Sequence, residues 1–247
     1  MHRERDGSAL LPQARIAGAL YLVIIAVGAF GQGFVRDGLI VAGDAAATAA
    51  NIHASQALWR ASASAELAYL ALAVVVDVLL YFVFRPVNRV VALLGFGLNL
   101  VSISVEVMGR FMLLAPLVFL GDGAYLQAFE PAQLQGLAFA FLRLHDLAFG
   151  LALIFFGCVC LCWGYLIRRS SFLPGTIGWL MQLAGACYLV NSYALLLSPR
   201  LAGALFPVVL LPALVAELSL ALWLLFKGVD VDAWRSADVA SAREVHV

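Results

Sequence analysis

The sequence predicts an all-α polytopic membrane protein, a bundle of six transmembrane helices. Hydrophobic residues make up 64% of the chain and charged residues 12%, whereas soluble domains average about half apolar and about a quarter charged. Six apolar stretches are each long enough to cross a bilayer, which takes about 20 mainly apolar residues. Fifteen basic residues balance fifteen acidic ones, so the net charge does not indicate a nucleic-acid partner.

The first predicted span covers residues 16–35, which carry no charge and are bounded by Arg15 and Arg36. The tripeptide AFG at 29–31 resembles a signal-peptide cleavage site, but the apolar run continues beyond it and five more follow, so a spanning helix is expected. The remaining predicted spans are 61–84, 90–109 with a continuation toward residue 120, 137–167, a helix within 170–199, and 205–226.

The connections between the spans also follow from the sequence. Pro86 and Pro174 break the helix in two short turns, RPVNR and RRSSFLP. The first loop on the opposite side is longer, and Asp44 is expected to cap a short alanine-rich helix over 45–55. The predicted organisation is therefore a tail at 1–14, a six-helix transmembrane domain at 15–227 and a second tail at 228–247.

Lysine and arginine set the expected orientation, because cytoplasmic loops of membrane proteins are enriched in them. Ten such residues lie in the two tails and the two short turns, and three lie on the opposite side. We therefore expect a multi-pass protein of a cell membrane, the bacterial inner membrane, with both termini in the cytoplasm. The ten are Arg3, Arg5, Arg15, Arg85, Arg89, Arg168, Arg169, Lys227, Arg235 and Arg243, and the three are Arg36, Arg60 and Arg200.

Six segments, spread in order over roughly residues 15–230, form a recognisable pattern: RIAGALYL, VAGDAAATAANI, LYFVFRPVNR, LHDLAFGLALIFFG, FLPGTIGWLMQLAGACYLVNS and AELSLALWLLFKGVD. With these segments the chain resembles a family of bacterial six-helix membrane proteins catalogued as domain of unknown function 4386. The resemblance implies the fold and the membrane location. The family has no assigned activity, so no functional residue is carried over.

Ionisable residues inside the spans are the candidate site, since charges in hydrocarbon are costly and usually face the bundle interior or water. With a rise of about 1.5 Å per residue, four helices deliver polar groups to one layer about 24–36 Å from their cytoplasmic ends. This is the outer edge of a hydrocarbon core about 30 Å thick. The predicted polar pocket comprises Glu66, Glu106, Arg110, Arg143, His145, Asp146 and Asn191.

The pairing pattern leaves two interpretations of this layer open. Glu106 and Arg110 are four residues apart and Arg143 and Asp146 three apart, so each set can form a local ion pair without any ligand. Alternatively, the layer is an outward-facing site.

Asp77 and Glu217 lie deeper in the predicted bundle and are candidate proton-linked acids, expected to meet across the second and sixth helices. The alternative is a protonated acid that is hydrogen-bonded to a neighbouring helix.

No other chemistry is indicated. The four cysteines lie in apolar stretches and are expected to be buried apolar residues, and no metal site or cofactor is expected. No zinc-protease, nucleophile-elbow or nucleotide-binding motif occurs. Glycines are expected at close helix contacts, namely Gly95, Gly97, Gly150, Gly157, Gly178 and Gly185.

Three functions remain open, with binding or transport of a small molecule or lipid through the polar pocket preferred. The others are a membrane-embedded enzyme that uses the Glu/His/Asp cluster and a structural or regulatory subunit without a site. The sequence indicates the lipid bilayer as the surroundings and leaves the oligomeric state undetermined.

Overall fold

The computed structural model describes residues 2–205 and 208–244, and this part of the chain forms helices and no strand. Within it, six helices are long and apolar enough to span a membrane, so the prediction of an all-α polytopic membrane bundle is confirmed. The spans are Leu10–Leu39, Gln56–Phe84, Arg89–Phe119, Pro131–Arg169, Gly175–Leu197 and Val208–Phe226.

In the described ranges the helices follow one another with only short connections between them. The elements are α1 (His2–Ala29), η1 (Phe30–Arg36), α2 (Asp37–Leu39), α3 (Ala45–Ala54), α4 (Gln56–Phe84), α5 (Arg89–Phe119), η2 (Ala124–Ala128), α6 (Pro131–Arg169), α7 (Gly175–Leu197), α8 (Pro199–Leu205), η3 (Val208–Leu210), α9 (Leu211–Phe226) and α10 (Val231–Glu244).

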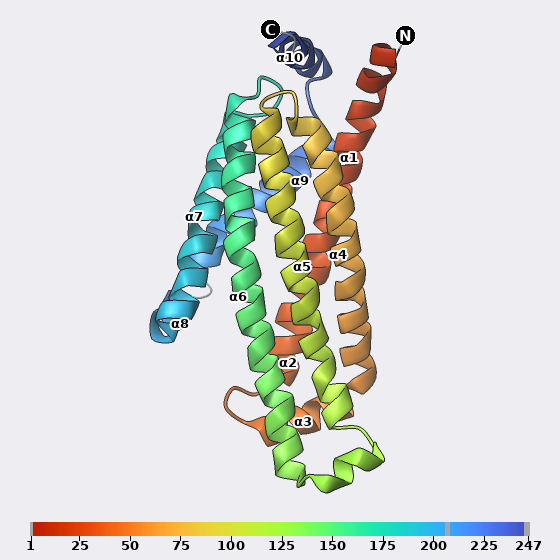
Figure 1. Cartoon of the computed structure of the whole chain (residues 1–247), viewed down its shortest axis with the longest axis vertical. Helices are drawn as coiled ribbons and strands as arrows, with labels where there is room; N and C mark the ends of the chain where they lie inside the picture. Colours follow the sequence, from red (N-terminus) through yellow and green to blue (C-terminus); the bar gives the residue numbers. More distant parts are fainter. Residues whose placement is uncertain (1, 206–207, 245–247) are drawn as a thin grey trace.

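The six long helices form a closed ring. α1 packs against α4 and α9, and the ring continues from α4 through α5, α6 and α7 back to α9. Both termini lie at one end of the bundle, which we call the termini end, and α2, α3 and η2 lie at the opposite, distal end (Figure 1). The ring creates an interior whose two halves differ in chemistry.

The termini end of the ring is filled by apolar side chains from all six helices. Leu80, Leu166, Met181 and Leu220 are fully buried in this core, together with Ala14 of α1. The expected tail at 1–14 is helical from residue 2 onward. Because Ala14 belongs to the core, part of this tail packs with the transmembrane domain.

Glycine pairs allow α6 and α7 to approach closely. A Cβ on Gly185 would lie 2.6 Å from the carbonyl oxygen of Gly157, and one on Gly178 would lie 2.8 Å from that of Gly164. The predicted close contacts at Gly95 and Gly150 are also present, but a Cβ added to Gly97 would have no atom within 4 Å, so that prediction was wrong. Periodicity alone does not show which face of a helix meets a neighbour.

Several helices are longer than their apolar stretches. α6 has 39 residues and α7 has 23, and α6 extends past α7 and α8 toward the distal end (Figure 1). α6 begins at a capping box in which Glu130 and Gln133 bond each other's backbone. α9 begins at Leu211, later than predicted from residue 205, because Pro212 suits the first turn of a helix and Leu205 belongs to α8.

Each end of the bundle carries a short additional helix. The predicted helix after Asp44 is confirmed as α3, and the Asp44 side chain accepts a hydrogen bond from the Ala47 N–H. At the termini end α10 is held by Trp234, whose ring N–H donates to the Val83 carbonyl at 2.9 Å. The expected C-terminal tail is therefore partly an ordered helix.

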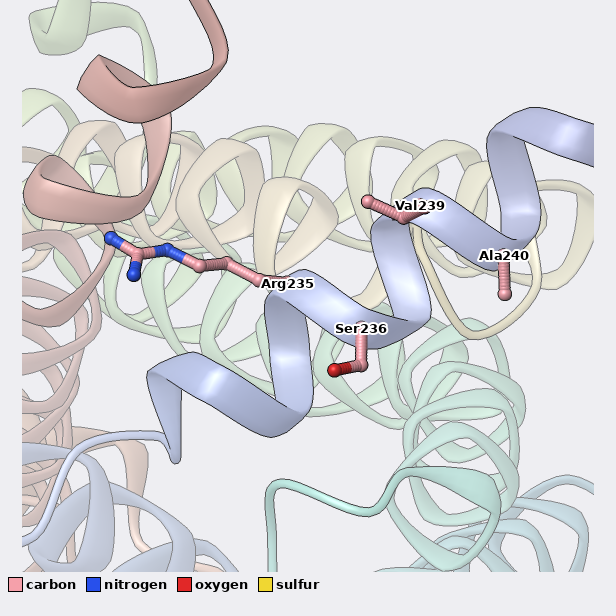
Figure 2. A pocket seen from close by; sticks show the side chains of 4 residues that line it. All are labelled: Arg235, Ser236, Val239 and Ala240. Carbon is pink, nitrogen blue, oxygen red and sulfur yellow. The ribbon is translucent and has the colours of Figure 1, made fainter.

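The outward face of α10 carries a shallow, open depression. Its side chains come from this one helix and point to different sides of it (Figure 2). They are Arg235, Ser236, Val239 and Ala240. A depression that a single helix lines does not enclose a ligand, unlike a cavity in the bundle interior.

Candidate functional site

Arg110 of α5 is the centre of a buried polar network near the distal end. It is 2% exposed, and its Nε lies 2.9 Å from Glu66 Oε2. One Nη donates to Tyr69 Oη and lies 3.3 Å from Glu106 Oε2, while the other lies 3.4 Å from His145 Nε2. One guanidinium group therefore connects side chains of α4, α5 and α6.

Glu66 is the partner shared by two arginines. It is fully buried, and its Oε1 accepts from Arg36 at 2.5 Å and from Ser62 at 3.2 Å, while Oε2 faces Arg110. With both acids ionised, Arg36, Arg110, Glu66 and Glu106 carry no net charge. A buried cluster of this kind is tolerated because each charge has an opposite partner.

Arg36 reaches Glu66 because the first span has an irregular end. Residues 30–36 are π-helical, a conformation that is rare and often found at functional sites. Gly31 in this segment contacts Glu66, and a Cβ there would lie 2.8 Å from the Glu66 Cδ. Arg36 also donates to Gln32 Oε1 at 2.9 Å, which fixes its side chain along the segment.

His145 is held in one tautomer by its neighbours. Its Nδ1 lies 3.1 Å from the Gly109 carbonyl oxygen, which can only accept, so Nδ1 carries the hydrogen. Its Nε2 faces the guanidinium of Arg110, which can only donate, so Nε2 is the acceptor. The imidazole is therefore neutral, and both of its nitrogens have partners.

A small cavity adjoins the Arg36–Glu66 pair. Its volume is about 10 Å³, which is roughly the space of one water molecule. Trp59 closes one side and donates its ring N–H to the Leu113 carbonyl at 2.7 Å. The lining residues are Val35, Arg36, Trp59, Ser62, Ala63, Glu66 and Leu113.

Only some of the predicted pocket residues meet. Glu66, Glu106, Arg110 and His145 are brought together, as the shared layer suggested.

Arg143 and Asp146 instead pair with each other at 3.2 Å on the surface, where their side chains are 70% and 49% exposed. The side of α6 that carries Arg143 and Asp146 faces away from α5, whereas His145 faces α5. Asn191 of α7 is buried, and no hydrogen bond among the described residues joins it to the network.

Four members of the network lie outside the predicted pocket: Arg36, Tyr69, Gln32 and Ser62. Arg36 was expected to lie beyond the first span, because the apolar run ends before it. The spacing of Gln32 and Arg36 by four, and of Glu66 and Tyr69 by three, is the helical-face signal that identifies them. The spacing of Gln32 and Arg36 is informative only if the first helix continues to residue 39, as it does in the structure.

The two deeper acids lie apart from this network. Glu217 of α9 accepts hydrogen bonds from Tyr21 and Tyr188, not from Asp77. Asp77 of α4 is 1% exposed, and neither of its carboxyl oxygens has a hydrogen-bond partner in the described structure. In that part of the chain no group of three or more His, Cys, Asp or Glu side chains is arranged to hold a metal ion.

The fold and the network define a polytopic membrane protein whose first, second, third and fourth spans are joined by buried polar and charged side chains near one end. The chain belongs to the family described as Domain of unknown function (DUF4386), whose profile matches residues 16–228. The resemblance noted from the sequence is thus confirmed. A comparison with curated proteins gave no match, and neither did a comparison with solved structures.

Proposed function

We propose that this membrane protein binds a small molecule with a carboxylate or phosphate group at its distal end. The observation that supports this is the Arg36–Glu66 ion pair beside a small cavity, within a network that draws on four spans. Buried charges inside a membrane bundle commonly mark ligand or ion sites.

The arrangement favours an anion over a cation. Arg36 and Glu66 both line the cavity, and Arg36 is the more exposed of the two, at 6% against 0%. A guanidinium presents a planar fork of donors that matches carboxylate and phosphate oxygens. If a ligand took over Arg36, Glu66 would keep Arg110 as its partner, and Arg110 would then be shared by Glu66 and Glu106.

Entry would require movement of the π-helical segment. The cavity of about 10 Å³ is too small for such a ligand in this conformation. The segment at 30–36 contains Gly33, and Gly28 lies shortly before it; a Cβ added to either would have no atom within 4 Å. No other part of the described protein packs against these two glycines, and we propose that the segment shifts relative to α4 to enlarge the cavity.

The proposed orientation places this site at the extracytoplasmic face. Ten lysines and arginines lie in the tails and short turns and three, Arg36, Arg60 and Arg200, on the opposite side, with Arg110 and Arg143 inside spans left uncounted, so both termini are proposed to be cytoplasmic. We propose the bacterial inner membrane as the location, and access of the ligand from outside the cell.

The enzyme alternative has less support from the geometry. Both nitrogens of His145 are engaged by the Gly109 carbonyl and by Arg110, and Asp146 pairs with Arg143 at the surface. A general acid–base group must reach the proton it transfers. In this conformation neither side chain lines the cavity beside Glu66.

Thermal unfolding of the purified protein tests the proposal. We expect simple carboxylates or phosphates at millimolar concentration to raise the melting temperature, since a ligand at 100 times its Kd stabilises by about 2.7 kcal/mol. Arg36→Gln should abolish the increase. Arg143→Gln is the matched control, because it removes an exposed arginine from the same end and should leave the increase intact.

Two results would contradict the proposal. One is that no carboxylate or phosphate in the series changes the melting temperature. The other is equal stabilisation of the wild type and Arg36→Gln, which indicates binding elsewhere. Either result would favour the structural alternative, in which the network only fastens the spans to one another.

A further inference from the structure

Glu217 occupies a second polar site, formed by different helices. Its carboxyl group on α9 accepts a hydrogen bond from Tyr21 of α1 on Oε2, at 2.9 Å, and one from Tyr188 of α7 on Oε1. These contacts link the three helices on the side of the ring away from Arg110. The hydrogen bonds of this site therefore involve no side chain of the proposed ligand network.

The surroundings of Glu217 are apolar. Its helical neighbours Ala213, Ala216 and Leu220 are fully buried, and the residue itself is 9% exposed. The titratable groups that face it are Tyr21 from α1, Tyr188 from α7 and Cys160 from α6, and the carboxyl group of Glu106 from α5 acts on it at longer range. No lysine, arginine or histidine of the described chain lies within ion-pair distance of its carboxyl group.

Glu66 provides an internal comparison. Both are glutamates buried in spans, but Glu66 faces two guanidinium groups and Glu217 faces two phenols. A lone carboxylate in a membrane interior is costly, and binding a proton removes the charge. We propose that Glu217, together with Tyr21 and Tyr188, forms a proton-binding site in the interior of the membrane domain.

Protonation changes the contacts between helices. In the ionised form both phenols donate, one to each carboxyl oxygen. In the protonated form the carboxyl O–H takes up one position and donates to a phenol oxygen, so that phenol turns its own hydrogen elsewhere. One of the two links from α9, to α1 or to α7, is then reversed, and proton binding is coupled to the packing of these helices.

Infrared spectroscopy of the full-length protein in lipid, with ¹³C-carboxyl-labelled glutamate, tests the site directly. A protonated carboxyl group gives a C=O stretching band that is separate from that of a carboxylate. We expect such a label-shifted band at neutral pH, and we expect Glu217→Gln to remove it. The label also excludes Asp77, whose oxygens lack partners, because aspartate stays unlabelled.

Glu130→Gln is the matched control. Glu130 is exposed at the start of α6, and its replacement should leave the band unchanged. Tyr188→Phe removes a donor that stabilises the ionised form, so the pH at which the band disappears should rise by about one unit.

Two outcomes would overturn the proposal. The first is the absence of a labelled C=O band from the wild type at neutral pH, a result that needs no variant to fold. The second is a band that persists in Glu217→Gln, which would assign it to another glutamate. Neither outcome bears on anion binding at Arg36, so this proposal and the proposed function fail independently.

Discussion

Replacing Glu66 by glutamine is the sharpest perturbation of the network. The change keeps the shape of the side chain and removes its charge. Glu66 Oε1 accepts hydrogen bonds from Arg36 and Ser62, and Oε2 lies 2.9 Å from Arg110 Nε in an ion pair. A glutamine amide offers one acceptor and one donor group, so in either orientation its NH₂ meets at least one arginine donor.

The expected cost follows from the burial of these groups. Arg36 and Arg110 are 6% and 2% exposed, so both would remain largely out of water after the change. Removing one partner of a buried ion pair typically costs about 3–5 kcal/mol, whereas an exposed pair contributes less than about 1 kcal/mol. Arg110 retains Glu106, and we therefore expect a loss of about 3 kcal/mol.

Reversible unfolding in mixed detergent micelles measures this loss. Asp146→Asn is the control, because it removes an acid from an ion pair with Arg143 that is exposed at the surface. The double variant Glu66→Gln with Arg110→Met should lose less than the sum of its single changes, because it removes both opposed charges.

Similar, small losses for Glu66→Gln and Asp146→Asn would refute the reasoning. They would show that water reaches the network in the membrane-embedded protein, so that the arginines are hydrated and not dependent on Glu66. Additive losses in the double variant would likewise contradict a direct interaction between Glu66 and Arg110.

Two further predictions concern the packing of the first span and the topology. Gly31→Ala should destabilise the protein by about 1–3 kcal/mol in the same unfolding assay, because its Cβ overlaps Glu66. Gly33→Ala is the control and should be neutral or slightly stabilising, since no protein atom lies within 4 Å of its added Cβ. Equal effects of the two changes would contradict the close contact at Gly31. Cysteines placed at Ala46 and Ala124 should react with an impermeant thiol reagent in intact cells, and one at Ser171 should not, relative to the parent with its native cysteines; the reverse pattern would invert the proposed orientation.

Much of the fold could be predicted from the sequence because transmembrane helices have a strong local signal. A spanning segment satisfies its own backbone hydrogen bonds, so length and hydropathy suffice to locate it. The Asp44 cap and the proline-containing turns are likewise local features. The ends of the helices were predicted less accurately, because a helix continues beyond its apolar stretch where polar residues face water or a partner. α6, for example, begins at Pro131, before the predicted start at residue 137.

The candidate site was predicted only in part, and the reason is geometric. Helical depth placed Glu66, Glu106, Arg110 and His145 in one layer, and they do meet. Depth does not specify rotation, so it included Asp146, which lies in the same layer but on the outer face of α6.

The sequence by itself therefore determined the class of protein, the number of spans and the set of costly polar residues within them. Only the tertiary structure decided which of these residues are partners. Arg36 joins Glu66 because a π-helical segment carries the first span past its apolar end, and Glu217 meets two tyrosines because α1 and α7 flank α9 in the ring. Such contacts depend on how whole helices rotate and pack, and the energy that fixes this is spread over many side chains far apart in the sequence.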